Sequence, residues 1–169
     1  MKVKFKKTNP NAKMPVKAHF SDFCYDVFAA SREEIAPNVY KYGLGIALQV
    51  VREDDSVLIN KINNAKHYVF EKTLNFTNFS GNISIDLRPR SSVWKTGLVL
   101  SNCTGTIDEG YTGEISAVFY KVAEGKIYEV GDRIGQIKLG FTLPMDFIEV
   151  DEIDDTERGA GAYGSSGLR

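Results

Sequence analysis

The sequence has few of the residues that bind metals or form disulfides. Its 169 residues include two cysteines, Cys24 and Cys103, and two histidines, His19 and His67. Two cysteines cannot form the disulfide framework of a small secreted domain, and the histidines and cysteines do not have the spacing of a zinc site. Disulfide scaffolding and protein-held zinc are therefore excluded as the basis of the fold.

Long apolar runs and an excess of one charge are also missing. No segment approaches the roughly 18 consecutive apolar residues of a membrane span, and residues 1–7 lack the apolar core of a signal peptide. The 21 Lys and Arg residues nearly balance the 22 Asp and Glu residues, so no overall field attracts nucleic acid or an anionic membrane. We therefore expect a soluble, intracellular protein of the cytoplasm or nucleus, with neither nucleic acid nor membrane as a partner.

The composition favours strands over helices. Val, Ile, Phe, Thr, Tyr and Trp together number 55, against 24 for Ala, Leu and Met, which are good helix formers. Apolar residues alternate with polar ones over residues 3–5, 83–87, 98–100 and 115–119, and Gly, Pro, Asn or Asp separates these segments. This pattern predicts an all-β sandwich or barrel, with one short helix near residues 92–96.

The length predicts a single domain over residues 1–169. Two segments differ in composition from the rest of it. Residues 52–82 are rich in Asn and acidic residues and read as an insertion, either a hairpin excursion or a surface loop. Residues 156–169 contain four glycines and no apolar periodicity, which indicates a flexible glycine-rich tail.

The tail contains a formal match to the dinucleotide-binding pattern G-x-G-x-x-G at residues 159–164. That pattern requires a following helix and a distant acidic residue, and the sequence ends five residues later. Glycine-rich backbone can still approach phosphate oxygens, with Arg158, Ser165 and Ser166 as further donors. By itself the tail is either a phosphate-binding arm or a solvated terminus.

Two further segments carry chemistry. Pro89 fixes the backbone between cations so that Arg90 and Ser91 are presented rigidly, as a phosphate site requires. Asp108 and Tyr111 share a glycine-punctuated turn, where a carboxylate could act as a general base and a ring could support a flat ligand. The common alternative for Asp108 is a turn-capping aspartate.

The order of these segments is more specific than any one of them. The series Cys24-Tyr-Asp-Val27, Pro89-Arg-Ser-Ser92, Gly105-Thr-Ile-Asp-Glu-Gly-Tyr-Thr-Gly113, Gly131-Asp-Arg-Ile-Gly-Gln136 and Arg158–Gly167 resembles the five ordered motifs of the homotrimeric dUTPase family. The resemblance covers residues 21–167. It implies a jelly-roll-type β-barrel that assembles as a homotrimer, with the arm over 156–169 closing a neighbour's active site.

The resemblance also implies an activity, the hydrolysis of dUTP to dUMP and pyrophosphate. Asp108 is similar to the carboxylate that activates the water attacking the α-phosphorus, and Gln136 and Arg158 complete the implied catalytic set. Tyr111 is similar to the ring beneath the deoxyribose, and Tyr163 to the ring that stacks on uracil. The implied substrate-binding residues are Arg90, Ser91, Ser92, Asn102, Gly105, Ile107, Tyr111, Gly161, Tyr163, Gly164, Ser165 and Ser166.

The implied cofactor is Mg²⁺, held mainly by the substrate phosphates, with Asp26 contributing through water. Phe23 and Cys24 stand where the family usually has Ala and Gly, and Tyr163 replaces a usual Phe. Two alternatives share this fold. A dCTP deaminase would need a glutamate where this chain has Val118, and a non-catalytic nucleotide sensor would not need the catalytic set.

Overall fold

The computed structural model describes residues 2–51 and 81–160, and these residues form strands joined by turns and one 3-10 helix. The elements follow one another as β1 (Lys2–Lys7), β2 (Tyr25–Phe28), β3 (Glu33–Ala36), β4 (Val39–Gly43), β5 (Ile46–Val51), β6 (Asn82–Pro89), η2 (Ser91–Thr96), β7 (Leu98–Leu100), β8 (Gly105–Ile107), β9 (Ser116–Lys121) and β10 (Arg133–Thr142).

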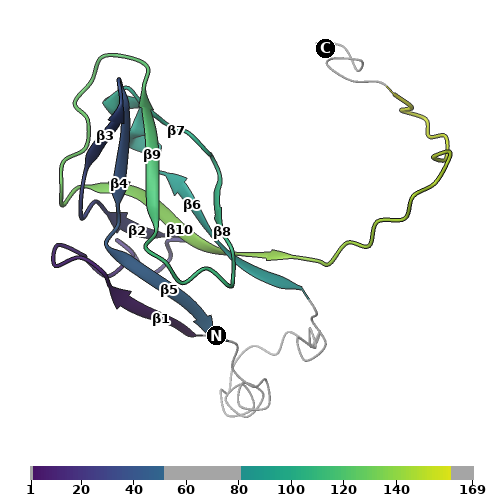
Figure 1. The fold of residues 1–169 in the computed structure, drawn as a ribbon, viewed down its shortest axis with the longest axis horizontal. Coiled ribbons are helices and arrows are strands. Elements are labelled where there is room, and N and C mark those ends of the chain that lie inside the picture. Colours follow the sequence, from purple (N-terminus) through teal and green to yellow (C-terminus); the bar gives the residue numbers. More distant parts are fainter. Residues whose placement is uncertain (1, 52–80, 161–169) are drawn as a thin grey trace.

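The strands form three antiparallel sheets (Figure 1). One sheet has the order β2-β10-β6-β8, a second has the order β3-β4-β9-β7, and β1 pairs with β5. Neighbours in a sheet are mostly distant in the sequence, so the chain passes repeatedly between sheets, as in a jelly roll. The predicted all-β, jelly-roll-type fold is confirmed.

Alternation along the strands builds the core between the two larger sheets. On β6, Ile83, Ile85 and Leu87 are buried while the residues between them are not. The centre contains three rings, because the ring centroid of Phe119 lies 5.7 Å from that of Tyr42 and 5.8 Å from that of Tyr128. Burial raises the pKa of the Tyr42 phenol to about 12.

The alternating segments all became strands, namely β1, β6, β7 and β9, and the short helix is η2. The helix ends at Gly97, which has a left-handed backbone with φ +66°. A side chain there would also meet the carbonyl oxygen of Ala123, so glycine satisfies both the conformation and the close approach.

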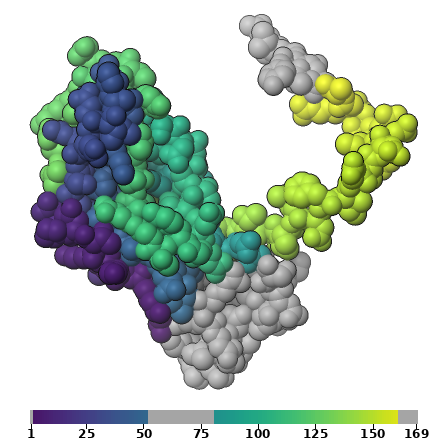
Figure 2. Space-filling model, viewed as in Figure 1, coloured from purple at the N-terminus to yellow at the C-terminus, as the bar shows by residue number. Residues whose placement is uncertain are grey.

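The polypeptide leaves the sheets after β10. Residues 143–160 run away from the barrel without strand pairing (Figures 1 and 2). Most of the predicted insertion, residues 52–80, and the end of the arm, residues 161–169, lie outside the described residues. No helix in the described ranges has both the length and the apolar character needed to cross a membrane.

The aromatic centre predicts a large difference between two neighbouring positions on β9. Phe119 is 1% exposed and Tyr120 is 48% exposed. We expect Phe119→Ala to lower the free energy of unfolding by about 3–5 kcal/mol, because it leaves a cavity between the sheets. Tyr120→Ala is the matched control and should cost less than about 1 kcal/mol. Urea denaturation of both variants checks this, and similar losses would contradict the packing described.

Candidate functional site

A buried carboxylate lies at the centre of the most polar cluster of the β2-β10-β6-β8 sheet. Asp26 on β2 is 5% exposed. Its Oδ1 accepts a hydrogen bond from Nε2 of Gln136 at 3.2 Å and lies 3.4 Å from Nε of Arg90. Its Oδ2 lies 3.2 Å from Nη1 of Arg133. We call these four residues the Asp26 cluster. Its two cations and one anion leave a net positive charge.

The sheet register explains how the cluster assembles. β10 lies between β2 and β6, so Gln136 pairs with Asp26 on one side and with Arg88 on the other. Arg90 immediately follows β6 and has an extended backbone, with φ −74° and ψ 154°, as the cap of η2. Pro89 and the end of β6 therefore direct Arg90 towards Asp26.

A β-bulge brings Arg133 to the same carboxylate. Arg133 is opposite Phe28 and Gly135 is opposite Val27, so β10 has one extra residue between these pairs. In a regular strand, residues three apart point to opposite faces, and the extra residue reverses that relation. The bulge thus places Arg133 and Gln136 on the face that carries Asp26.

Phe28 supports Arg133 from the side. The guanidinium carbon of Arg133 lies 5.8 Å from the centroid of the Phe28 ring, and Nζ of Lys13 lies 5.0 Å from the same centroid. Lys13 also donates a hydrogen bond to the carbonyl of Gly131, at 3.2 Å, in the turn before β10. These contacts hold Arg133 independently of Asp26.

The two serines after Arg90 begin η2. Ser91 is exposed and Ser92 is half-buried. The helix is fixed by its own bonds, because the backbone N–H of Val93 donates to the carbonyl of Arg90 at 3.0 Å and Oγ1 of Thr96 donates to the carbonyl of Val93 at 2.5 Å. The serine hydroxyls therefore begin a short rigid element beside the Asp26 cluster.

Asp108 and Tyr111 lie together in the turn after β8, and both are exposed. The backbone N–H of Tyr111 donates to the carbonyl of Asp108 at 3.0 Å, and the Tyr111 hydroxyl donates to the carbonyl of Glu114 at 2.8 Å. A Cβ on Gly113 would lie 2.6 Å from that hydroxyl. The turn thus fixes the Tyr111 ring against its own backbone, and the absence of a side chain at Gly113 leaves space for the ring.

The same turn is tied to the rest of the barrel through Glu114. Its Oε1 accepts a hydrogen bond from the backbone N–H of Gly45 at 3.0 Å, at the junction between β4 and β5. Asn102, in the hairpin before β8, is exposed, and its side chain lies over the buried Gly105. Ile107 packs against the core from the end of β8.

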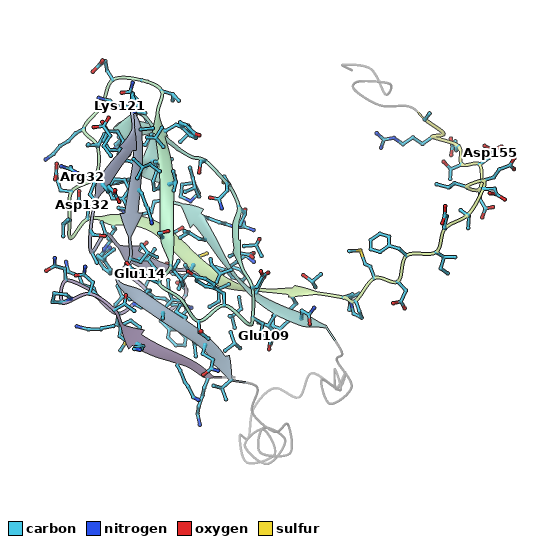
Figure 3. The ribbon with its side chains drawn as sticks, in the orientation of Figure 1. Arg32, Glu109, Glu114, Lys121, Asp132 and Asp155 are labelled. Atoms are coloured by element: carbon cyan, nitrogen blue, oxygen red, sulfur yellow. The ribbon has the colours of Figure 1, made fainter. Side chains whose placement is uncertain are left out.

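The turn with Asp108 and the Asp26 cluster lie at opposite ends of β6. Glu109 Oε2 accepts from the backbone N–H of Ile83, near the start of β6, at 3.2 Å, whereas Arg90 follows the end of the strand. Arg90 follows Ile83 by seven positions, which in an extended strand is roughly 23 Å. Figure 3 labels Glu109 and Asp132, the residue before β10, in well separated parts of the molecule.

One chain therefore brings together Asp26, Arg90, Ser91, Ser92 and Gln136, but it does not bring them to Asp108, Tyr111 and Asn102. Arg158 is exposed on the extended segment beyond the barrel. The remaining predicted arm residues, Gly161, Tyr163, Gly164, Ser165 and Ser166, lie outside the described residues.

Two residues of the site received no role from the sequence. Arg133 is inside the fourth motif, but its face depends on a bulge that alternation does not reveal. Glu114 follows the third motif, and its partner at Gly45 is 69 positions away. The only local signal for Glu114 was an acidic residue directly after the third motif.

The sheet continues from the cluster into a second ion pair. Lys138 Nζ lies 2.9 Å from Oδ2 of Asp86, and the Ser84 hydroxyl donates to Oδ1 of Asp86 at 3.1 Å. The hydrogen bond from Lys138 is the main cause that lowers the pKa of Asp86 below its usual 3.8, against the opposing effect of burial. This pair lies two rows along the sheet from Gln136 and Arg88, with Ile137 and Leu87 between them.

Comparisons with known proteins point to one family. A family model described as dUTPase matches residues 59–167. The deoxyuridine 5'-triphosphate nucleotidohydrolase of Alkaliphilus metalliredigens (strain QYMF) is 30% identical over 170 residues, an alignment that covers 99% of this chain and 98% of that relative.

Solved structures show the same fold. A mutant dUTPase of Staphylococcus bacteriophage 80alpha with dUpNHpp has a TM-score of 0.70 and 23% identity, and the match covers 99% of each chain. A mutant dUTPase from phage phi11 of S. aureus, with a coordinated structural Mg(II) ion, has a TM-score of 0.62 and 19% identity, and covers 92% of this chain and 100% of that one. At these identities the likeness is one of fold.

The Asp86 pair predicts a pH dependence of stability. A lowered pKa in the folded state means that Asp86 stabilises the fold above its unfolded pKa, near 3.8, and that this contribution is lost as the pH falls through the lower folded pKa. We expect Asp86→Asn to lower the free energy of unfolding by about 1 kcal/mol at pH 6. The difference from the unsubstituted protein should shrink below pH 3.8.

Chemical denaturation between pH 3 and pH 7, at values chosen to bracket that pKa, measures this difference. Glu124→Gln, at an exposed position on the β9–β10 connection, is the control and should follow the unsubstituted protein throughout. A stability difference for Asp86→Asn that stays constant across the range would show that the charge of Asp86 is not the stabilising feature.

Proposed function

Because this chain belongs to the dUTPase family, we propose that it hydrolyses dUTP to dUMP and pyrophosphate, which limits uracil incorporation into DNA and supplies dUMP for dTTP synthesis. The observation that carries the proposal is that one chain contains two preformed half-sites. One is a cationic cluster suited to phosphates, and the other is a turn that presents an exposed carboxylate beside a ring. Hydrolysis of a nucleoside triphosphate needs both.

Asp108 is the general base of this proposal. Its exposed carboxylate orients and deprotonates the water that attacks the α-phosphorus, and pyrophosphate leaves in line. Tyr111 supports the deoxyribose, where a 2′-hydroxyl would clash with its ring, and Asn102 and Gly105 belong to the hairpin that reads the uracil edge. The rigid hold on Tyr111 by the Glu114 carbonyl supports a steric role.

The phosphates bind at the Asp26 cluster. Arg90 and Ser91 contact them directly, Ser92 continues the same turn, and Gln136 contacts the phosphates or the attacking water. The net positive charge of the cluster supports this assignment, since a triphosphate concentrates negative charge at that position.

The residues fit Mg²⁺ that is held mainly by the substrate. Residues 2–51 and 81–160 contain no group of three or more His, Cys, Asp or Glu side chains that could hold a metal. The Asp26 carboxylate already accepts hydrogen bonds from Arg133 and Gln136 and forms an ion pair with Arg90, so it is suited to contact the ion through water rather than directly. When bound, Mg²⁺ would neutralise charge on the phosphate oxygens.

Assembly as a homotrimer would join the two half-sites. No single chain brings Asp108 to Arg90, and a neighbouring copy can supply the missing half. The segment after β10 supports association, because Leu143, Met145, Phe147, Ile148 and Val150 are between 58% and 89% exposed. Such an apolar stretch is typical of a contact surface. The arm over 156–169, with Arg158, would then close a neighbour's site.

The alternative of a dCTP deaminase is not favoured. Val118 stands where the deaminase needs a glutamate, and it pairs with Lys41 inside the β3-β4-β9-β7 sheet, where its side chain can neither donate nor accept a proton. A nucleotide sensor would bind without turnover. Incubation with dUTP, dCTP or UTP and Mg²⁺ separates these functions: pyrophosphate from dUTP supports the proposal, whereas ammonia from dCTP or binding without turnover would replace it.

The proposed base predicts the behaviour of Asp108→Asn. This variant keeps the size of the side chain but cannot take a proton, so we expect turnover of dUTP to fall by about 10²- to 10⁴-fold. Binding of dUpNHpp, measured by titration calorimetry, should change little, because Asp108 acts on the water. Retained turnover would remove Asp108 from the role of base.

Two glycines of the same turn predict a change in sugar selectivity. A Cβ on Gly113 would meet the Tyr111 hydroxyl at 2.6 Å, whereas one on Gly110 would meet nothing within 4 Å. Gly113→Ala should displace the ring and lower the ratio of kcat/KM for dUTP to that for UTP by about tenfold. Gly110→Ala is the matched control and should keep the original ratio. An unchanged ratio in Gly113→Ala would mean that the ring does not exclude the ribonucleotide.

A further inference from the structure

The Asp26 cluster contains one more positive charge than its carboxylate requires. Arg90 and Arg133 approach different oxygens of Asp26, at 3.4 Å and 3.2 Å. The side chain of Asp26 is 7% exposed, against 31% for Arg90 and 43% for Arg133. A carboxylate at this depth needs at least one charged partner, because an unpaired buried charge is strongly destabilising.

The two arginines are held differently. Arg133 contacts Asp26 through a terminal nitrogen and also lies over the Phe28 ring. Arg90 contacts Asp26 through Nε, on the side edge of the guanidinium, so the end-on pair of N–H groups, one on each terminal nitrogen, points away from that contact. The terminal nitrogens of a guanidinium are the ones that bind phosphate in a forked geometry. Arg133 is thus braced in the cluster, and Arg90 is presented towards an anion.

We propose that Arg133 is a positioning residue that acts through Asp26. It remains paired with the buried carboxylate, so that Arg90 can move from Asp26 to the phosphates of dUTP without leaving a buried charge unpaired. The inference rests on the proposed function, since it gives Arg90 a phosphate to bind. Without Arg133, Arg90 would be the sole cation paired with Asp26, and the energy of breaking that pair would be subtracted from substrate binding.

The same arrangement fixes the amide of Gln136. Its Nε2 donates to Asp26 Oδ1 at 3.2 Å, and a carboxylate only accepts hydrogen bonds, so the carbonyl oxygen of the amide must point away from Asp26. A carboxylate held at both oxygens keeps that orientation. Arg133 therefore also supports the acceptor that Gln136 offers to a water or a protonated group.

The test uses Arg133→Met, which removes the charge and keeps much of the length. We expect binding of dUpNHpp, measured by calorimetry, to weaken by roughly 10- to 100-fold, and KM for dUTP to rise far more than kcat falls. Arg133→Lys keeps the charge beside Asp26 and should bind the analogue within about threefold of the unsubstituted protein. Lys4→Met, at an exposed position on β1 in the separate β1-β5 sheet, controls for net charge and should not alter affinity.

The double variant Asp26→Asn with Arg133→Met provides the decisive comparison. With the carboxylate neutralised, Arg90 no longer has a buried partner to leave, so the double variant should bind dUpNHpp more tightly than Arg133→Met alone. A purely structural role for Arg133 predicts the opposite, because two lesions in one cluster would add. Thermal unfolding of each variant confirms that the comparison is made between folded proteins.

The outcomes separate this inference from the function on which it rests. If the unsubstituted protein does not release pyrophosphate from dUTP, the proposed function fails. If it does, three results each overturn the role of Arg133. These are unchanged affinity in Arg133→Met, equal weakening in Arg133→Met and Arg133→Lys, and a double variant that binds no more tightly than the single one.

Discussion

A charge taken out of water must be paired, and in this barrel that requirement falls on Asp26. The carboxylate is 5% exposed, and its partners come from three places: the end of β6, the beginning of β10 and the middle of β10. These contacts require a particular order of strands, in which β10 lies between β2 and β6. They also require the bulge at the start of β10, without which Arg133 would point to the other face.

The position of this cluster bears on the proposed assembly as a trimer. Because the cluster and the turn with Asp108 occupy opposite ends of β6, the barrel offers two half-sites that face different surroundings. The extended segment after β10 runs away from the sheets (Figure 1), and its apolar side chains are exposed. In an isolated chain the exposed apolar segment costs free energy, and the two half-sites cannot act on one substrate. Association of copies would bury the segment and bring two halves together. The proposed site shared between subunits would account for both features in one fold.

Much of this fold could be predicted from the sequence, since alternation marks a strand with one buried face wherever it occurs. It identified β1, β6, β7, β9 and the short helix. It did not identify β3 or β5, because Glu33–Ala36 is exposed throughout and Ile46–Val51 is buried almost throughout, and neither pattern alternates. In β10 a bulge interrupts the alternation near the start of the strand.

The candidate site was also only partly predictable from the sequence. The ordered motifs identified Asp26, Arg90 and Gln136, and the structure brings these three residues together. Arg133 lay in a motif without a role, because its contact depends on a register shift that no local pattern reveals. Glu114 acts through an amide 69 residues away, and contacts between distant segments are set by tertiary packing. Sequence reasoning therefore named residues that the structure brings together, but not the residues that support them.

The central claim, that one active site needs the Asp26 cluster of one chain and the Asp108 turn of another, is tested most directly by mixing two inactive variants. Asp108→Asn and Arg90→Met would be denatured together in equal amounts, refolded and assayed for pyrophosphate from dUTP. If sites are shared between neighbouring chains, about a quarter of them combine two intact halves, and activity returns to about that fraction of the unsubstituted protein. A mixture no more active than the two variants refolded separately would contradict the account.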